Sequence, residues 1–406
     1  MRIVLIHRYF APDTPPYAHI LRDIALRLGE DGHEVTVLTC QPSYNRAVVD
    51  RAPKVERLAD NVTVRRWPVF DDRTSAPLKA LNLATFCVRL LASRARLGRV
   101  EVIMAASTPP VAPAKAASWL ARLCGAKFVY HKQDIYPEVV TAPGMLRAGR
   151  LADLLRRIDA RTERAAAEVV VLSKDMAATV RSRGAGAERV AVINNFDPWT
   201  GASPAGSARR EQGRAPLRVV FAGNLGRFQN IEAVLDAMVK VGADDRVRLD
   251  FLGDGALRSE LEATVEARGL TNVSFRGYQA PEEVARVLRE EADLGVVSLV
   301  AGVIRAAYPS KTMSYLRNGC PVLALVEADS ELARAVVAAG AGVQHDPADA
   351  GGLADLLLEL AGRRDELAVM RDHALALYRT QFDPQLQLAK WAELFASLDG
   401  ERVGAP

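Results

Sequence analysis

Apolar positions recur along the chain in two alternating patterns. Short runs rich in valine, isoleucine and leucine are followed by longer stretches with helical spacing, and then the apolar runs return. This alternation is typical of parallel sheets that are covered by helices on both faces. In the first half, the apolar runs predict strands at Ile3–His7, Val35–Thr39, Val62–Trp67, Val102–Ala105, Phe128–His131, Val169–Leu172 and Val190–Ile193. The first half therefore predicts one doubly wound α/β domain.

The pattern breaks once and then restarts. Residues 198–216 combine Gly, Ser, Pro and Ala without periodicity, which predicts a linker. A second series of strands is expected at Leu217–Ala222, Leu249–Leu252, Val273–Phe275, Leu294–Leu299, Val322–Leu325 and Gly342–Gln344. We therefore expect two tandem Rossmann-like domains, 1–197 and 217–383, that face each other across a cleft. A final helix at 384–400 is expected to complete the first domain.

Composition narrows the class of protein. Of the 406 residues, 25% are charged and 49% are hydrophobic, as in ordinary globular proteins. The 53 basic and 49 acidic side chains give a net charge of +4, so we expect no nucleic-acid partner. The cysteines form no CxxC pair and the histidines no HxxxH or HExxH pair, so neither a disulfide framework nor a metal site is expected.

Two features bear on location. Residues 2–6 are predicted to form a buried strand, which leaves no room for a signal peptide. The apolar runs at 102–114 and 294–304 are too short to span a bilayer. We therefore expect a cytoplasmic protein.

A glycine-rich turn follows the strand at Leu217–Ala222. Gly223 and Gly226 stand between this strand and a helix expected to begin near Ile231, so that backbone N–H groups can approach an anion at the helix N-terminus. Arg227 adds a guanidinium that suits phosphate. The alternative is a tight turn with a surface arginine. A GxGxxG fingerprint is absent here and at Gly253–Gly255, which disfavours a nicotinamide enzyme.

A second segment with candidate chemistry starts at Pro309. Pro309 and Ser310 are helix-start signals, and Gly319 ends the helix before the next strand. Lys311 stands in the first turn, where the helix dipole disfavours a cation. An anion bound between the helix and this lysine would explain its position; the alternative is a solvated lysine.

The chain resembles the family-4 retaining glycosyltransferases of the GT-B fold, in particular the bacterial O-antigen and exopolysaccharide branch with a Pro-Ser-Lys segment. The donor-domain resemblance lies in Gly223–Arg227, Gly253–Gly255 and Pro309–Lys311 leading to Gly319–Val322. The acceptor-domain resemblance lies in Tyr9–Asp13, Gly32–Thr39 and Asp134–Glu138.

This resemblance implies transfer of a sugar from a nucleotide-diphosphate sugar, with UDP or GDP as the nucleotide, to a glycan or lipid-linked acceptor. Retention of configuration, no metal and no other cofactor are implied as well, because protein cations can replace a divalent ion at the leaving diphosphate. Arg227 and Lys311 would be catalytic and hold the diphosphate. The other donor-binding residues would be Gly223, Asn224, Gly226, Gly253, Asp254, Ser310 and Ser314.

The chain departs from the family pattern at two points of the donor site. Many members carry two glutamates eight positions apart, and Ala306 and Ser314 stand there instead. Ser314 can still bond a ribose hydroxyl, whereas the sugar contact is unassigned. The second phosphate lysine expected a few residues after Arg227 is missing, and Lys311 would compensate. Because no carboxylate nucleophile stands out, we favour a front-face mechanism over a double displacement.

Candidate acceptor residues lie in the first half. Where the family has glycines after the first strand, this chain has a stiffer loop, Pro15–His19. Tyr17 and His19 are candidates to line the cleft, with a purely structural role as the alternative. Asp134 and Glu138 are further candidates, although Asp134 could instead cap the next helix. The family histidine falls on Gln133 and is not transferred to His131.

Two other functions stay open. A nucleotide-sugar 2-epimerase shares this fold, but it needs acid/base carboxylates and histidines, and histidines are sparse here. A nucleotide-sugar-binding protein without catalysis would explain Ala306 and Ser314.

Two segments of the first half combine apolar and basic residues, 78–99 and 146–164. Basic amphipathic helices bind anionic bilayers. We therefore hypothesise peripheral binding to the inner face of the cell membrane, with ordinary domain helices as the alternative.

Overall fold

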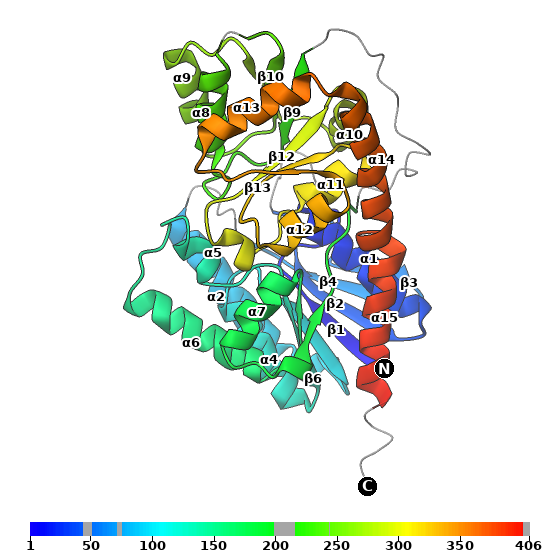
Figure 1. Cartoon of the computed structure of the whole chain (residues 1–406). Helices are drawn as coiled ribbons and strands as arrows, with labels where there is room; N and C mark the ends of the chain where they lie inside the picture. Colours follow the sequence, from blue (N-terminus) through cyan, green and yellow to red (C-terminus); the bar gives the residue numbers. More distant parts are fainter. Residues whose placement is uncertain (44–50, 71–74, 199–215, 243, 401–406) are drawn as a thin grey trace. The chain divides into compact units, whose positions relative to one another are not determined.

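The computed structural model describes residues 1–43, 51–70, 75–198, 216–242 and 244–400 (Figure 1). The chain divides into two compact units. The N-terminal unit comprises Met1–Pro198, Ala306–Tyr308 and Pro384–Pro406, and the C-terminal unit comprises Trp199–Arg305 and Pro309–Asp383. Residues 199–215 of the predicted linker lie outside the described residues.

The N-terminal unit contains an eight-stranded sheet with the order β3-β4-β2-β1-β5-β6-β7-β8. Its strands are β1 (Arg2–Ile6), β2 (Glu34–Cys40), β3 (Val55–Ala59), β4 (Val62–Trp67), β5 (Val102–Ala106), β6 (Lys127–Lys132), β7 (Glu168–Val171) and β8 (Val190–Val192). All neighbours are parallel except β3, which pairs antiparallel with β4 at the sheet edge. β3 was not predicted from the sequence, because this short edge strand, Val-Glu-Arg-Leu-Ala, lacks the regular alternation of a half-buried strand.

The helices of this unit lie on both faces of the sheet (Figure 1). They are α1 (Pro16–Glu30), α2 (Ala76–Ala92), α3 (Arg94–Leu97), α4 (Ala112–Cys124), α5 (Glu138–Thr141), α6 (Arg150–Arg164), α7 (Lys174–Ser182), the short η1 (Ala187–Arg189) and α15 (Pro384–Gly400).

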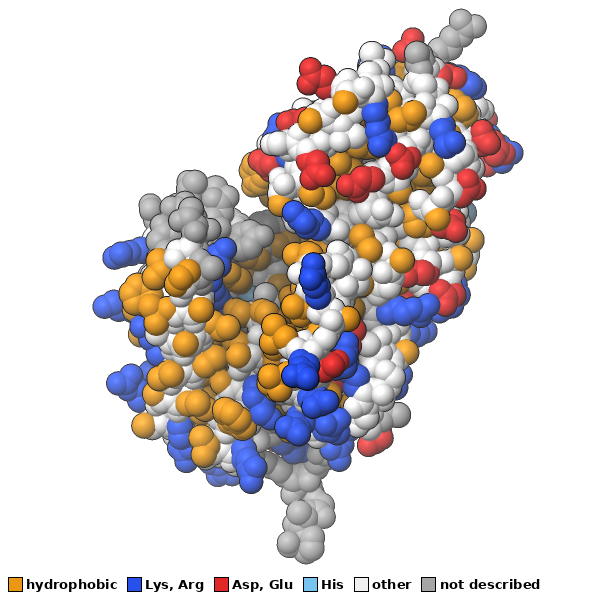
Figure 2. All heavy atoms as spheres, turned by 90° about the vertical axis from the view of Figure 1, so that its left-hand side faces the viewer, with side chains coloured by type: hydrophobic (Ala, Val, Ile, Leu, Met, Phe, Trp, Pro, Cys, Tyr) orange, Lys and Arg blue, Asp and Glu red, His pale blue; other side chains and the backbone are white. Residues whose placement is uncertain are grey.

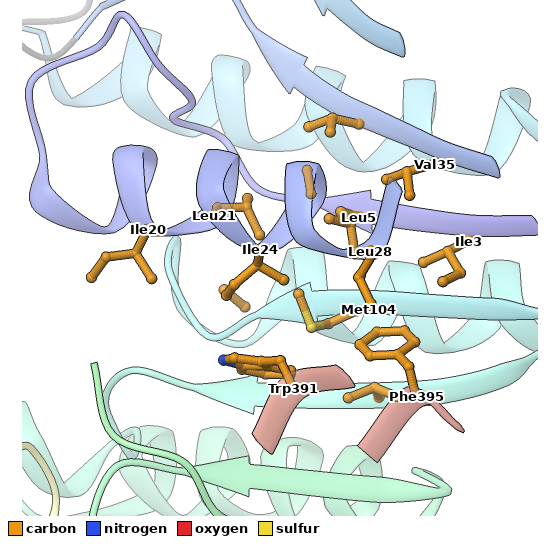
Figure 3. Close-up of a cluster of buried hydrophobic side chains, with 14 of the residues drawn as sticks. Ile3, Leu5, Ile20, Leu21, Ile24, Leu28, Val35, Met104, Trp391 and Phe395 are labelled. Atoms are coloured by element: carbon orange, nitrogen blue, oxygen red, sulfur yellow. The ribbon is translucent and has the colours of Figure 1, made fainter. Parts of the chain in front are cut away.

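The C-terminal helix α15 belongs to the core of the N-terminal unit. Trp391 and Phe395 project from it toward Met104 of β5 and the apolar side of α1 (Figure 3). Trp391 is 1% exposed and Phe395 is not exposed at all. A long-range contact of two large aromatic side chains therefore ties the chain's last helix to its first domain.

The C-terminal unit contains a six-stranded parallel sheet with the order β11-β10-β9-β12-β13-β14. Its strands are β9 (Leu217–Ala222), β10 (Val247–Leu252), β11 (Val273–Gly277), β12 (Leu294–Ser298), β13 (Val322–Leu325) and β14 (Gly342–Gln344). Its helices are α8 (Ile231–Val241), α9 (Arg258–Ala267), α10 (Pro281–Glu290), η2 (Val303–Arg305), α11 (Lys311–Arg317), α12 (Glu331–Ala338), α13 (Ala350–Ala361) and α14 (Arg364–Gln381). The strand order reverses between β9 and β12, and ligands of open α/β sheets bind at such a switch point.

The α/β fold with parallel sheets confirms the predicted fold class. The four cysteines are free thiols. Among the described residues, no helix is both long and apolar enough to cross a membrane.

Candidate functional site

Two glycine-containing loops interlock at the carboxyl edge of the C-terminal sheet. Gly223 after β9 and Gly253 after β10 have φ angles of +125° and +146°, which favour glycine. A Cβ on Gly253 would lie 2.0 Å from the carbonyl oxygen of Gly223. The backbone N–H of Leu225 donates to the carbonyl of Asp254 at 2.9 Å. The glycines are therefore required for the close approach of the two loops.

The loop from β9 to α8 is also held from the side of β12. The Ser298 hydroxyl donates to the carbonyl of Asn230, which is the left-handed N-cap of α8. The backbone N–H of Val300 donates to the carbonyl of Phe228 at 2.9 Å. Between these anchors, Arg227 presents an exposed side chain. The loop thus carries a cation beside the N-terminus of α8, where anions are favoured.

Lys311, the first residue of α11, lies along this loop. Its Nζ donates to Oε1 of Gln229 at 2.6 Å and lies 3.5 Å from the centroid of the Phe221 ring. A Cβ on Gly223 would be 3.9 Å from its Cε. Burial lowers the pKa of Lys311 well below its usual value. Among the residues that the structure describes, no carboxylate pairs with Lys311.

Tyr315 forms a hydrogen bond with the last residue of β9. It was not predicted as a site residue. Its hydroxyl accepts from the backbone N–H of Ala222 at 2.8 Å. Its ring packs so tightly on Gly295 of β12 that a Cβ there would lie 2.5 Å from the ring. The lone glycine inside a buried strand was the available signal, because it marks a close approach by another group. Tyr315 therefore sets the position of the residue that precedes Gly223.

The remaining predicted donor residues lie on the same loops and on α11. Asn224 is exposed, with its side-chain amide beside Gly226, and the Asp254 carboxylate accepts from the backbone N–H of Gly255 at 2.8 Å. Ser314 follows Lys311 by about one helical turn and is partly exposed. Ser310 stands at the predicted helix start, yet its side chain forms no capping hydrogen bond and is exposed.

In the N-terminal unit, Tyr17 and His19 were predicted to lie in a loop, but they lie in helix α1. Pro16 occupies the first position of α1, where its fixed φ and missing N–H suit a helix, so both residues lie in the first turns. Tyr17 is buried, and His19 is partly buried with its pKa lowered, chiefly by burial. Tyr17 therefore lies in the interior of the N-terminal unit, and His19 is partly accessible.

Tyr17 belongs to a buried polar cluster that contains two histidines, His7 and His131. Neither histidine was predicted as a site residue. The Tyr17 hydroxyl lies 2.8 Å from Nδ1 of His131, and its ring lies edge-on to His7. The side-chain amide of Gln133 donates to Nε2 of His131 at 2.8 Å and is itself bonded to Asn195. In a neutral imidazole, the nitrogen that accepts leaves the other to donate, here to Tyr17.

Burial keeps both histidines of this cluster neutral. It lowers the pKa of His7 to about 4 and that of His131 to about 3. Nδ1 of His7 lies 2.6 Å from the carbonyl oxygen of Tyr9, whereas its buried Nε2 has no partner among the described residues. The cluster is therefore uncharged at pH 7.

Asp134 and Glu138 have different environments. The backbone N–H of Asp134 donates to the Ser107 hydroxyl, and burial raises the pKa of its carboxyl to about 6. Glu138 is paired with Arg156 at 2.9 Å and with Arg183, so its charge is compensated. Asp134 thus has a raised pKa without an ion pair that the structure records, which is common for carboxyls at functional sites.

Ala306 stands where the family resemblance expects a glutamate at the donor sugar. It belongs to the N-terminal unit, accepts a backbone hydrogen bond from Ile135 at 2.7 Å and is fully buried. The next residue, Ala307, forms an antiparallel bridge with Asp134. Position 306 thus has a packing role, which suits alanine.

Two further features lie away from these residues. Among the described residues, no group of three or more His, Cys, Asp and Glu side chains is arranged to hold a metal ion. A pocket of about 830 Å³ lies where β6 and β7 begin, at the edge of the sheet opposite His131, and is lined by Phe128 and Glu168 among others.

Comparison with known proteins identifies the family. Residues 17–195 match the model "Glycosyl transferase 4-like domain", and residues 208–374 match the model "Glycosyl transferases group 1". These two ranges together span most of both units. The chain belongs to the family-4 glycosyltransferases of the GT-B fold.

Two relatives extend this assignment. The glycosyltransferase is 25% identical to WcaI of Escherichia coli, named as a colanic acid biosynthesis glycosyl transferase, over 82% of this chain and 85% of that protein. It is 27% identical to the glycosyltransferase WbjE of Pseudomonas aeruginosa, over 66% of this chain and 68% of that protein.

Solved structures agree on the fold. Sucrose-phosphate synthase from Thermosynechococcus elongatus matches with a TM-score of 0.75 at 16% identity, over 99% of this chain and 100% of that one. Anabaena HepE in complex with UDP-glucose matches with a TM-score of 0.69 at 17% identity, over 98% and 100%. The fold class predicted from sequence is thus confirmed.

Proposed function

We propose that this glycosyltransferase moves a sugar from a nucleotide-diphosphate sugar to a glycan or lipid-linked acceptor in the assembly of an exopolysaccharide, O-antigen or glycoconjugate. The observation that carries the donor assignment is Lys311, a half-buried cation that lies against an aromatic ring and a glycine loop without a carboxylate partner in the described residues. The name of WcaI, a colanic acid glycosyl transferase, supports the polysaccharide context.

The diphosphate would lie between Lys311 and Arg227. A buried ammonium group that has lost its water is costly, and an anionic ligand repays that cost by Coulombic attraction. Gly223 is exposed and leaves the backbone open to a phosphate, Gly226 gives room to the Asn224 side chain, and the N-terminus of α8 favours the phosphate charge. These groups act where negative charge develops on the leaving diphosphate, so the reaction would proceed without a metal ion.

UDP is the nucleotide favoured by the comparisons, with GDP as the second choice. Structures of Anabaena HepE contain UDP and UDP-glucose. A structure described as trehalose-6-phosphate from Escherichia coli contains UDP-2-fluoro glucose. Ser314, about one turn beyond Lys311 on α11, would bond a ribose hydroxyl. Asn224, Gly253, Asp254 and Ser310 would complete the donor site.

A front-face mechanism with retention of configuration suits these residues. A double displacement needs a carboxylate next to the anomeric carbon, and a buried alanine occupies position 306. In the front-face mechanism, a leaving-phosphate oxygen takes the proton of the acceptor hydroxyl as that hydroxyl attacks from the same side. Lys311 and Arg227 would stabilise the negative charge on the departing diphosphate.

The acceptor would be bound by the N-terminal unit. Asp134 is the best candidate to bond an acceptor hydroxyl, because its carboxyl is not tied into an ion pair that the structure records, unlike that of Glu138. His19 is partly accessible and remains a candidate. Tyr17 would act by holding His131.

The test is thermal stabilisation by UDP, GDP, ADP, dTDP and CMP and their sugars, with EDTA present. A nucleotide at about 100 times its Kd should stabilise the protein by ~2.7 kcal/mol. Lys311→Met and Arg227→Met should abolish the shift, whereas Lys240→Met, an exposed lysine on α8, should retain it. Absence of a shift for every nucleotide would overturn the donor site.

Analysis of the products formed from the stabilising donor then distinguishes a transferase from a 2-epimerase and from a binding protein. Transfer to an added glycan or lipid-linked acceptor is expected. Epimerisation of the donor without an acceptor would point to a 2-epimerase, and binding without turnover would point to a sugar-nucleotide-binding protein.

A further inference from the structure

The N-terminal unit exposes an apolar face built by three neighbouring helices. α4 packs against α2 on one side and α6 on the other. The three helices expose large apolar side chains, among which Trp119 is 52% and Leu123 60% exposed. The others on these helices are Leu81, Val88, Leu151 and Leu154. Figure 2 shows hydrophobic side chains gathered on this unit, bordered by lysine and arginine. We call this surface the α2–α4–α6 face.

Charge on this face is almost entirely positive. Residues 75–100 and 108–127 contain no aspartate or glutamate. In α6, Asp159 and Glu163 are buried, and Asp153 is exposed but paired with Arg156. The exposed basic residues on and beside the three helices are Lys79, Arg94, Arg96, Arg99, Arg122, Arg147, Arg150, Arg157, Arg161 and Arg164.

Cations also approach one another between α4 and α6. Lys115 lies over the Trp119 ring at 5.6 Å, and its pKa is lowered by burial and by the charge of Arg161. The pocket of about 830 Å³ adjoins this point and is lined by Lys115, Trp119 and Arg122, and also by Glu168 and Glu188. An excess of positive charge around an apolar surface favours an anionic partner.

We propose that the α2–α4–α6 face docks on an anionic membrane surface. Apolar side chains would enter the boundary between head groups and acyl chains, with the Trp119 indole at that level and the surrounding arginines on lipid phosphates. A bilayer accounts for both properties of the face at once, its apolar centre and its cationic margin. The proposal goes beyond the transferase function and needs no donor, so the two can fail separately.

The experiment is flotation of the full chain with phosphatidylcholine vesicles, with and without phosphatidylglycerol, at low and high salt. We expect the protein to float with the anionic vesicles at low salt and to be released at high salt, because salt screens the charges. Absence of flotation at low salt would overturn the proposal.

Variants locate the contact. Trp119→Ser combined with Leu123→Ser and Leu154→Ser should reduce the bound fraction about tenfold. Arg122→Glu with Arg150→Glu and Arg157→Glu should do the same. The matched control is Val239→Ser with Val337→Ser and Val369→Ser, which alters apolar side chains of the C-terminal unit that are exposed to a similar degree.

The control should bind vesicles like the wild type, with unchanged unfolding midpoints for all variants that are compared. Equal losses in the control and the face variants would overturn the proposal. Light scattering provides a second readout. If the wild type is a dimer and the serine variants are monomers that float like the wild type, the face joins two copies of the chain instead.

Discussion

Each unit has a lysine near the carboxyl edge of its sheet, fully buried in the N-terminal unit and half-buried in the C-terminal unit, and the two lysines differ in their partners. Lys132, at the end of β6, contacts the carboxylates of Asp159 and Glu163, to which Arg183 also donates. Lys311 contacts an amide oxygen and an aromatic face instead. Lys132 is fully and Lys311 partly removed from water, and only the positive charge of Lys132 is compensated by recorded ion pairs within the fold.

This difference separates a structural lysine from a binding lysine. An ion pair whose members are all buried is satisfied without a ligand, and removing one member leaves an uncompensated charge. A buried cation without an anion costs stability until a ligand arrives. Lys132 is fully buried and Lys311 is half-buried, but the clearer difference lies in the neighbouring acids, which only Lys132 has as recorded partners.

The largest expected effect is that of Lys311→Met on transfer. We expect kcat/KM to fall about a thousandfold, or ~4 kcal/mol of transition-state stabilisation, because a cation is lost from the leaving diphosphate. The free protein should become more stable, because a partly desolvated ammonium group is removed. Steady-state transfer assays and urea unfolding of the same samples measure both effects.

The sign of the stability change follows from the pKa. Because the folded pKa of Lys311 is lowered, the wild type loses stability as pH falls below the unfolded value of 10.5. Lys311→Met should lack this loss between pH 10 and 7. A variant less stable than the wild type at pH 7 would contradict the comparison.

Lys132→Met should lower the stability of the protein, the opposite of the change expected for Lys311→Met. We expect a loss of about 3 kcal/mol in the free energy of unfolding, since Asp159 and Glu163 are left in the core with Arg183 as their remaining cation. Urea unfolding measures the loss. Adding Asp159→Asn and Glu163→Gln should recover part of it. If Lys132→Met folds normally and loses only transfer, Lys132 has a role in catalysis.

The histidine cluster predicts acid sensitivity of the N-terminal unit. His7 and His131 have folded pKa values of about 4 and 3, below the usual 6.5, so the unfolded chain binds protons first. Stability is therefore complete above pH 6.5 and declines toward pH 4. From pH 7 to 5 we expect a loss of about 2 kcal/mol per histidine. Urea unfolding at both pH values, repeated with His131→Gln, tests this slope.

Tyr315→Phe should give the smallest effect. It removes the hydroxyl that accepts from the Ala222 N–H, and an unpaired buried N–H costs about 1 kcal/mol. Donor affinity should weaken a few-fold, because the end of β9 carries Gly223. Thermal unfolding with and without UDP separates the two effects. An unchanged midpoint would show that the hydroxyl contributes nothing.

Local patterns predicted the sheets and the glycine loops correctly. The strands of both sheets recur within a few residues of their expected bounds, and the helix after the glycine loop begins at Ile231, as expected. These features depend on periodicity and on turn chemistry, which a short stretch of sequence contains in full. The edge strand β3 escaped detection, because its solvent-facing residues lack that periodicity.

The sequence by itself determined the fold class and the family, since both follow from ordered local motifs. Tertiary structure decided which polar residues have partners. Tyr17 meets His131 across 114 positions, Tyr315 meets Ala222 across 93, and Trp391 enters a core built by the first strands. Whether a lysine pairs with carboxylates of the same chain or can bind an anionic ligand depends on such contacts. Local sequence patterns cannot predict these contacts, because the partners come together only when the sheets and helices pack.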